Sequence, residues 1–369
     1  MKKYRPERIY VDVAVADEPV TQHTLRQARD VPVTYVRSRE ELSRLYAGDT
    51  TLTLGKKRLV LTRHPGKFLK GCQGCTDRRV HCNYFTVTYA VNCHLECTYC
   101  ILQAYLNNPF MRVYANIPDL LGELDAAFLQ NPRVVYRVGT GELSDSLGLD
   151  HLTGISRWLV RFFAGRPNAV LELKTKTDNV DNLLQVPANS NTVVSWSINT
   201  PRISAHEEWK TATLEEKLDA ARRCADHGYP LAFHFDPLVH YDGWQEDYRG
   251  LVNLLYDRFA PREITWLSLG TLRFHPELRD VIGWRFPHSK ILSGELVRGA
   301  DGKYQYFKPL RVEMYARVLE WIRQRSSDGA VYLCMETPDV HRKVFGERLV
   351  QSGTLGQYMD QQVLVTIRS

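Results

Sequence analysis

Six apolar runs alternate with amphipathic stretches between residues 84 and 284, and this alternation limits the fold more than any other feature of the sequence. Apolar runs of this length are typical of buried strands, while the stretches between them repeat their apolar residues at helical spacing. Strands that alternate with helices predict a parallel sheet wound from β-α units, and hence an α/β fold. The expected strands are 85–91, 133–139, 169–175, 192–199, 231–238 and 264–272.

Two less regular segments flank this core. They give three predicted parts: an N-terminal extension at 1–83, the β-α core at 84–284 and a C-terminal extension at 285–369. In the first part, RSREELSRLYAG predicts a helix, and TLTLGKKRLVLTRHPG predicts two short strands around a Gly-Lys turn. The last part predicts a basic, Tyr-rich loop (GELVRGADGKYQYFKP), a helix (LRVEMYARVLEWIRQR) and a final strand (AVYLCME).

The sequence contains no run of about 18 apolar residues, and its start has no secretory pattern, so we expect a cytoplasmic protein without a membrane span. Disulfides are rare in the cytoplasm, where clustered cysteines more often bind metal or carry out redox reactions. The net charge of +6 is compatible with a polyanionic partner such as nucleic acid, but it does not by itself establish one.

Three cysteines follow directly after the first predicted strand, in VNCHLECTYC: Cys93, Cys97 and Cys100. On one regular helix they would form a stripe roughly 10 Å long, too long for one small metal centre. The segment should therefore curl as a loop at the carboxyl end of the strand, where parallel α/β folds place active sites. A structural zinc normally takes four ligands, whereas three thiolates suit an iron–sulfur cluster with one open iron. The alternatives are packed thiols or a zinc knuckle.

The C-x3-C-x2-C spacing, with the aromatic Tyr99 before the third cysteine, resembles the signature of the radical S-adenosylmethionine (SAM) superfamily. The resemblance implies a 4Fe-4S cluster on these cysteines, with SAM on the open iron and a 5′-deoxyadenosyl radical after reductive cleavage. After the second strand, GTGELSDS resembles the motif that binds the methionine amino group. Gly139 and Gly141 would let the backbone approach a ligand closely, and Glu142 would meet its amine.

Within the superfamily, residues 84–285 most resemble spore photoproduct lyase and its relatives. The resemblance lies in CTYCILQAYLNNPFMRVYANIPDL, SDSLGLDHLTG, KTDNVDNLL and SWSINT, which occur in the family's order. It implies a partial (β/α)6 barrel of the TIM type, and cofactor contacts from Ser144, Lys176 and Ser197. It also implies an electron donor such as flavodoxin or ferredoxin.

The sequence departs from the lyase pattern at two positions. The lyase has a hydrogen-donating cysteine just after its second strand, where this chain has Glu142, and a tyrosine after the third cluster cysteine, where it has Ile101. A carboxylic O–H is a poor donor of a hydrogen atom, so the product radical must end differently. Cys334, which closes the final strand, is a candidate replacement donor, with core packing as the alternative, and Tyr99 remains beside the cluster.

Other residues carry weaker predictions. Cys72, Cys75 and Cys82 could hold zinc or a second iron–sulfur cluster, with His64 or His81 as a further ligand, or they could be reduced thiols in a basic loop. The segment RGADGKYQYFKPLR could grip nucleic acid through stacking and phosphate contacts, or it could be a solvated hairpin.

His234 and Asp236 should share one face of the fifth strand, and Asp236, near the carboxyl end of that strand, should line the pocket. Cys224, in a predicted helix, should simply be buried.

The sequence therefore predicts a radical SAM enzyme that abstracts hydrogen from a nucleic-acid base or damaged dinucleotide, with carbon–carbon bond cleavage as in DNA photoproduct repair. One alternative is the same chemistry on a peptide or small metabolite. A second, from a different class, is a zinc-containing nucleic-acid-binding module without catalysis.

Overall fold

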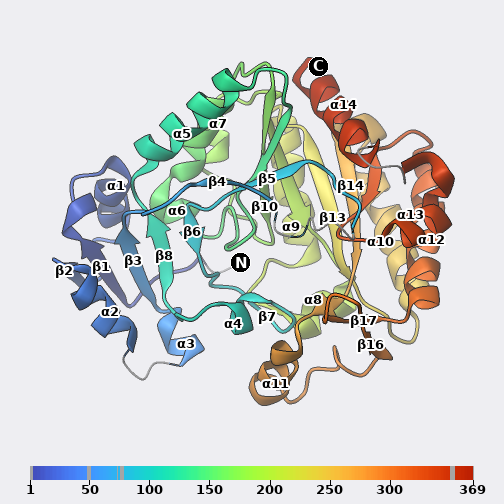
Figure 1. Ribbon diagram of the computed structural model, residues 1–369, viewed down its shortest axis with the longest axis horizontal. Coiled ribbons are helices and arrows are strands. Elements are labelled where there is room, and N and C mark those ends of the chain that lie inside the picture. The colour runs from blue at the N-terminus through green and yellow to red at the C-terminus, as the bar shows by residue number, and fades with distance from the viewer. Residues whose placement is uncertain (1–2, 48–50, 73, 75–78, 350–353, 369) are drawn as a thin grey trace.

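The computed structural model describes residues 3–47, 51–72, 74, 79–349 and 354–368. Its main feature is an eight-stranded sheet in the order β18-β14-β13-β11-β10-β9-β5-β4, which curls without joining its two end strands (Figure 1). Seven of the strands run parallel, and β4 is antiparallel to β5. The strands are β4 (Leu69–Gly71), β5 (Tyr84–Val87), β9 (Tyr136–Gly139), β10 (Ala169–Thr175), β11 (Thr192–Ser197), β13 (Leu231–Leu238), β14 (Ile264–Thr271) and β18 (Val331–Leu333).

The predicted partial barrel is confirmed, and all six predicted core strands are present. The first predicted strand is divided between β5 and β6 (Ala90–Val91), and the predicted final strand, β18, joins the sheet beside β14. The burial of the strands explains why their apolar runs could be recognised in the sequence. Every residue of β9 and β11 is buried, as expected for a parallel sheet covered on both faces, although Arg137, Thr192, Ser195 and Ser197 interrupt the apolar residues of these strands.

Helices follow the strands and cover the sheet, as α7 illustrates with its buried Ile155, Leu159, Val160 and Phe163. The N-terminus of α9 is fixed by a capping box, in which the Thr213 hydroxyl accepts from the backbone of Glu216 and the Glu216 carboxylate accepts from that of Thr213. These helices are α5 (Ile117–Gln130), α6 (Asp150–Thr153), α7 (Ile155–Phe163), α8 (Pro201–Glu207), α9 (Leu214–Asp226), α10 (Trp244–Arg258) and α12 (Lys308–Arg325).

The N-terminal part forms a second sheet in the order β2-β1-β3-β8-β6. Its elements are β1 (Arg8–Asp12), α1 (Pro19–Gln27), β2 (Val33–Val36), α2 (Arg39–Ala47), α3 (Leu52–Gly55), β3 (Arg58–Thr62) and β8 (Met111–Tyr114). The helix predicted in RSREELSRLYAG is confirmed as α2. The prediction of two strands in TLTLGKKRLVLTRHPG was wrong for the first one. That segment is α3, because the Thr51 hydroxyl accepts from the Leu54 amide and caps a helical turn.

The C-terminal part contains the predicted helix, α12, and places the predicted basic loop in a small antiparallel sheet. The sheet consists of β15 (Arg273–Phe274), β16 (Leu296–Arg298) and β17 (Tyr304–Tyr306). The other helices are α11 (Pro276–Arg285), α13 (Pro338–Phe345) and α14 (Thr354–Arg368), and short 3-10 helices lie at Val13–Val15, Leu183–Gln185, Pro261–Glu263 and Gly346–Leu349. No helix in the described part of the chain is long and apolar enough to cross a membrane.

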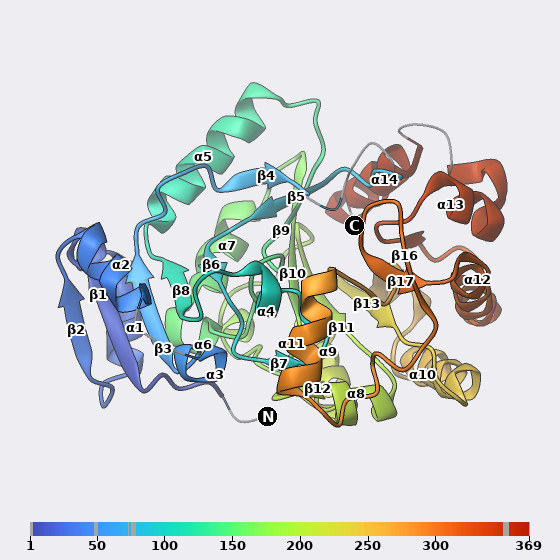
Figure 2. The ribbon, with the colours of Figure 1, turned by 60° about the horizontal axis from the view of Figure 1, so that its bottom comes forward.

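The three-part division stays a prediction, but both proposed boundaries are crossed by strand pairing. β3, from the N-terminal part, pairs in parallel with β8, and β14 pairs with β18, from the C-terminal part. The helix α14 packs against buried side chains of the curled sheet, including Val170 and Trp266. The N-terminal sheet lies beside one edge of the curled sheet and the C-terminal helices beside the other (Figures 1 and 2).

Candidate functional site

The three predicted cluster cysteines lie in a loop and not on one helix, as the spacing suggested. After β6 the chain turns at Asn92, forms the two-residue strand β7 (Glu96–Cys97) and enters the single-turn helix α4 (Leu102–Tyr105). The turn is fixed because Asn92 has a left-handed φ of 74° and its side chain accepts from the Cys93 amide and donates to the Pro109 carbonyl, both at 2.8 Å. We call residues 92–101 the cluster loop.

Burial raises the pKa of all three thiols in this loop, and that of Cys97 to about 12. Lys56 acts in the opposite direction on Cys93 and Cys100, and Lys176 does so on Cys97 and Cys100. A group that binds here must therefore bring its own positive charge to hold the three thiolates, as an iron–sulfur cluster does. In the described part of the chain, no three His, Cys, Asp or Glu side chains converge on a single-ion site. A four-iron cluster needs no such convergence, because each thiolate meets a different iron. The donor set fits the cluster.

Side chains from distant segments hold the cluster loop in place. The Gln103 amide donates to the carbonyls of Cys97 and Thr98, both at 3.0 Å. The Thr98 hydroxyl donates to the Glu207 carboxylate at 2.6 Å. Arg285, at the end of α11, donates to the side chains of Glu96 and Gln103. The loop is thus fixed by α8 and α11 as well as by its own backbone.

Glu208 is the central residue of this neighbourhood, and sequence reasoning missed it. It belongs to β12 (Glu208–Trp209), which pairs antiparallel with β7 and sets Glu208 opposite Cys97. Its fully buried carboxylate accepts from Lys176 at 2.8 Å, from Lys217 at 3.0 Å and from the Tyr99 hydroxyl. Burial alone would raise the pKa of Glu208, but the two lysines outweigh it and hold that pKa below its ordinary value. No local sequence signal identifies this glutamate.

Glu208 therefore brings together two residues of the predicted site, Lys176 and Tyr99. The Lys176 ammonium lies 5.7 Å from the centre of the Tyr99 ring. Burial lowers the pKa of Lys176, but Glu208 more than compensates and raises it above the ordinary value. Burial, followed by the charge of Glu208, raises the pKa of Tyr99 well above 10, so this side chain of the cluster loop is a neutral phenol.

The turn after β9 presents Glu142 and Ser144 at the same end of the sheet. Glu142 is half-exposed, and no described residue makes a hydrogen bond with its carboxylate; Ser144 is buried. The adjacent Asp145, also missed, ties this turn to β10 by accepting from the Thr175 hydroxyl at 2.7 Å and the Lys176 amide at 2.8 Å. Glu142 is thus positioned by its neighbours and remains available to a ligand.

The two glycines of this turn have explanations within the protein. A β-carbon at Gly139 would lie 1.7 Å from the Tyr84 hydroxyl oxygen. The space that a side chain at position 139 would need is therefore occupied by Tyr84 of β5. A β-carbon at Gly141 would meet the Ser146 hydroxyl at 3.2 Å and the Lys174 carbonyl at 3.3 Å. Packing therefore excludes a β-carbon at Gly139 and leaves little room for one at Gly141, and the predicted contact of both glycines with a cofactor stays a prediction.

Asp236 and Cys334 lie close together near the carboxyl end of the sheet. A β-carbon on Gly270 would be 2.6 Å from an Asp236 carboxylate oxygen. The Asp236 side chain, from β13, therefore lies against Gly270 of the neighbouring strand, β14. Leu269 pairs with Leu333, which sets Cys334 beside Gly270, and the Cys334 amide donates to the Leu269 carbonyl at 2.8 Å. Burial and then the charge of Asp236 raise the pKa of the Cys334 thiol well above its ordinary value.

The remaining predicted residues of the sheet have separate environments. Ser197 is buried at the end of β11, and within the described chain its hydroxyl has no hydrogen-bond partner. The Nε2 atom of His234 lies 2.7 Å from the Glu172 carboxylate, so His234 pairs with β10 and not with Asp236. Cys224 is fully buried in α9, as predicted.

The second cysteine group is only partly described, because Cys75 lies outside the described residues. Cys72 and Cys82 are half-buried and lie near Cys334, whose thiol pKa is raised by burial, by Asp236, by Cys82 and, to a smaller extent, by Cys72. The ring of His64 packs at a tilt against the rings of Phe68 and Tyr114, at 4.5 and 4.4 Å between ring centres. A metal on Cys72, Cys75 and Cys82 stays a prediction.

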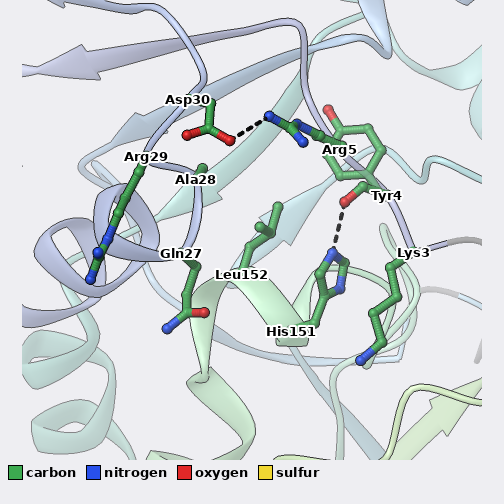
Figure 3. A pocket seen from close by; sticks show the side chains of 9 residues that line it. All are labelled: Lys3, Tyr4, Arg5, Gln27, Ala28, Arg29, Asp30, His151 and Leu152. Carbon is green, nitrogen blue, oxygen red and sulfur yellow. Dashed lines mark hydrogen bonds and ion pairs between the residues drawn. The ribbon is translucent and has the colours of Figure 1, made fainter.

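A cavity of about 250 Å³ lies beside the N-terminal sheet (Figure 3). Arg5 pairs with Asp30 at its rim at 3.1 Å, and the Nε2 atom of His151 lies 2.7 Å from the Tyr4 carbonyl. None of the predicted site residues lines it. Its lining residues are Lys3, Tyr4, Arg5, Gln27, Ala28, Arg29, Asp30, His151 and Leu152.

Comparisons with known proteins agree on one family. The family model described as spore photoproduct lyase matches residues 4–324. The spore photoproduct lyase of Geobacillus sp. (strain Y412MC61) is 27% identical over 315 residues, which cover 84% of this chain and 86% of the relative. That of Bacillus subtilis (strain 168) is 30% identical over 225 residues, which cover 60% and 66%. A solved structure, spore photoproduct lyase complexed with dinucleoside spore photoproduct, is 23% identical, with a TM-score of 0.78 over 90% of this chain and all of the other.

Proposed function

Because the chain belongs to the spore photoproduct lyase family of radical SAM enzymes, we propose that it abstracts a hydrogen atom from a damaged dinucleotide in nucleic acid and thereby allows a carbon–carbon bond to break. The observation that carries the proposal is the cluster loop, with Cys97 buried and Cys93 and Cys100 half-buried, in a chain that matches the family over residues 4–324. Family membership favours an enzyme over the non-catalytic zinc module.

In this proposal Cys93, Cys97 and Cys100 hold the 4Fe-4S cluster, and Glu142, Ser144, Lys176 and Ser197 contact SAM, with backbone contacts at Gly139 and Gly141. The cluster and SAM, when bound, supply the 5′-deoxyadenosyl radical. The protein's own contribution is to orient these groups and to exclude water. The buried Glu208 serves that purpose, because its hydrogen bonds fix the side chain of Tyr99, within the cluster loop, and that of Lys176.

The substrate class rests on two observations. A relative with the same fold is complexed with dinucleoside spore photoproduct, and this chain carries Arg298 and Lys303 on the hairpin formed by β16 and β17. Tyr306 of the hairpin is buried and accepts from the His240 amide at 3.0 Å, so it is not a stacking residue. Arg298 and Phe307 are exposed and are the side chains that we propose meet nucleic acid.

The substrate class can be tested through the cofactor. The protein, reconstituted with iron and sulfide without oxygen, is incubated with dithionite, SAM and either a lesion-containing oligonucleotide, the undamaged oligonucleotide or a peptide mixture. We expect the lesion to raise the release of 5′-deoxyadenosine above the rate without substrate, and the undamaged strand not to do so. Stimulation by the peptides alone would favour the alternative substrate class.

Replacing Glu142 with glutamine should weaken SAM binding by about tenfold or more. As a ligand, the carboxylate would accept a charge-assisted hydrogen bond from the methionine ammonium, and such bonds contribute roughly 1.5–3 kcal/mol. Equilibrium binding of SAM to the two proteins measures the effect. Equal affinity would mean that Glu142 has no role in cofactor binding.

We propose Cys334 as the residue that returns a hydrogen atom to the product radical, with Tyr99 as the second candidate. Hydrogen-atom donation breaks the S–H bond, forms a C–H bond and leaves a thiyl radical, so it requires a thiol and not a thiolate. Burial and Asp236 hold the pKa of Cys334 high enough to keep its proton.

Cys334→Ala should therefore leave SAM cleavage intact while product formation stalls or is diverted, as mass spectrometry of the products would show. If Cys334 only packs, the variant should give normal products and lose roughly 1–2 kcal/mol of stability. Normal products would remove Cys334 from the reaction.

A further inference from the structure

The two faces of the curled sheet can be distinguished by the alternation of side chains along its strands. On β10, Leu171 and Leu173 belong to the large core beneath the covering helices, whereas Val170 packs against α14. Successive side chains of a strand point to opposite faces, so Lys174 lies on the same face as Val170, which we call the inner face. The same alternation assigns to the inner face Ser195 and Ser197 of β11, His234 and Asp236 of β13, Ser268 and Gly270 of β14, and Cys334 after β18.

The inner face changes from apolar to polar along the strands. Near the beginning of the strands it carries Val170, Val193, Ala232 and Trp266, which pack in one cluster with α14. Toward the carboxyl end of the strands it carries Lys174, Ser197, Asp236 and Cys334. Active sites of parallel sheets lie at the carboxyl end, so the polar part of the inner face is on the functional side of the sheet.

Two charged side chains of this polar part have no partner within the described chain. Lys174 and Asp236 are both half-buried, and neither the ammonium nor the carboxylate makes a hydrogen bond or an ion pair there. The hydroxyls of Ser195 and Ser268, which are fully buried on the same face, are also unpaired. Removing charges and hydroxyls from water without a partner costs free energy, so this group of side chains indicates a binding site.

The two charges are separated by β11 and do not pair with each other. Lys174 is in register with Ser195, and Ser195 with Ala232, whereas Asp236 lies further along the same strand as Ala232. At about 4.8 Å between strands and 3.3 Å per residue, the two α-carbons lie roughly 10 Å apart across the sheet and 13 Å along it. Lys174 and Asp236 are therefore placed to bind different atoms of one molecule.

Asp236 lies between the two parts of the site that the proposed reaction uses. On one side its carboxylate lies against Gly270, beside Cys334, and after burial it is the main cause of the raised pKa of that thiol. On the other side, burial and the charge of Glu208 chiefly raise the pKa of Tyr99 in the cluster loop, and Asp236 adds to their effect. Such charge effects fall with distance, so a molecule bound by Asp236 would lie between the cluster loop and the proposed hydrogen donor.

The chemistry of the two unpaired groups limits the ligand. A carboxylate can only accept hydrogen bonds, and an ammonium can only donate them. Within a DNA strand the sugar hydroxyls are esterified, so the N–H groups of the bases are the donors that remain for Asp236. A thymine-type base has one imide N–H between two carbonyl oxygens, and it therefore offers a donor to Asp236 and an acceptor to Lys174 along one edge.

We propose that Asp236 and Lys174 recognise one base of the lesion by its imide edge: Asp236 accepts from the imide N–H, and Lys174 donates to a carbonyl oxygen. The inference rests on the proposed function and deepens it, because it names the class of base that the site selects. The two residues make and break no covalent bond. They hold the base next to Cys334, where its carbon radical would receive the hydrogen atom.

The test changes the acceptor on the protein and the donor on the ligand together. Wild type and Asp236→Ala, reconstituted and saturated with SAM but without a reductant, are titrated with dinucleoside spore photoproduct and with an analogue in which methyl groups replace the imide hydrogens. Asp236→Asn keeps a carbonyl acceptor, and Lys174→Met and Lys174→Arg examine the second contact. The controls are Asp328→Ala and Lys343→Met, at exposed positions outside the sheet.

We expect Asp236→Ala to bind the lesion at least about tenfold more weakly, as the loss of a charge-assisted hydrogen bond does. Methylation should weaken binding to wild type by a similar factor, but binding to Asp236→Ala by less than twofold, because that variant has no acceptor to lose. Asp236→Asn should be intermediate, Lys174→Met should bind about tenfold more weakly and Lys174→Arg less so. The controls should match wild type, and an unchanged SAM affinity should show that every variant is folded.

The proposal is overturned if Asp236→Ala binds the lesion within twofold of wild type, or if methylation weakens binding to both proteins equally. A loss of SAM affinity without a loss of lesion affinity would assign Asp236 to the cofactor instead. If Lys174→Met weakens only a lesion that carries a phosphodiester link, the lysine binds phosphate and not the base. Lesion binding by wild type with any of these results overturns the inference alone, whereas no binding by wild type overturns the proposed function with it.

Discussion

The Cys97→Ala variant should lose the iron of the cluster loop and all SAM cleavage. Cys97 is the most buried of the three thiols and the one opposite Glu208, so no solvent molecule can readily replace it as a ligand. With two thiolates left, the cluster loses one of its three protein ligands. Iron content, the electron paramagnetic resonance spectrum of the reduced protein and 5′-deoxyadenosine release are the three measurements.

Cys224→Ala is the matched control, because it also removes a buried thiol but lies in α9, away from the cluster loop. It should keep both iron and activity. Should Cys97→Ala still produce 5′-deoxyadenosine, the cluster assignment is wrong. If Cys72, Cys75 and Cys82 bind a second cluster, some iron will remain in Cys97→Ala, and for that reason SAM cleavage is the decisive measurement.

Replacing Glu208 with glutamine should destabilise the protein by about 3–5 kcal/mol, the usual cost of leaving a buried charge without its partner. The change leaves Lys176 and Lys217 buried side by side, and Lys217 is completely enclosed. The pKa of Glu208 is lower in the folded chain than in the unfolded one, so its contribution is present at neutral pH and is lost as the pH falls through the folded-state pKa. Urea unfolding at neutral pH measures the loss.

Glu320→Gln provides the comparison, since it removes a carboxylate from the half-exposed pair that Glu320 forms with Arg317. Exposed pairs contribute at most about 1 kcal/mol, so this variant should remain close to wild type. If the two variants were equally stable, the network around Glu208 would not hold the cluster loop as described.

The strands of the curled sheet could be predicted because they are buried on both faces, which makes their sequences rich in apolar residues. Most of the N-terminal sheet could not be predicted; only β3 and β6 fall in predicted strands. Its strands are short, and β8 lies within a segment that resembled only the family's cluster loop and following helix, whereas it pairs with β3 from the other side of the predicted boundary. The helix α3 was mistaken for a strand because a four-residue helix has no periodicity to detect, and only the cap at Thr51 indicates it.

The candidate site likewise has a part that the sequence predicted and a part that it did not. The cluster loop is a local motif, so the spacing of its cysteines was enough to predict a loop. Glu208 could not be predicted, because its partners Tyr99 and Lys176 are 109 and 32 residues away and meet it only after β12 pairs with β7. Gly139 shows the reverse difficulty: a glycine beside a motif suggested a ligand, but its space is filled by Tyr84.

The central claim is that this chain breaks a carbon–carbon bond in a nucleic-acid lesion with a radical from SAM. Its most direct test is to incubate the reconstituted protein without oxygen with dithionite, SAM and dinucleoside spore photoproduct, and to identify the products by mass spectrometry. We predict that the lesion is converted to the undamaged dinucleoside in the wild type and not in Cys97→Ala. An intact lesion, together with 5′-deoxyadenosine release at the rate seen without substrate, would contradict the claim.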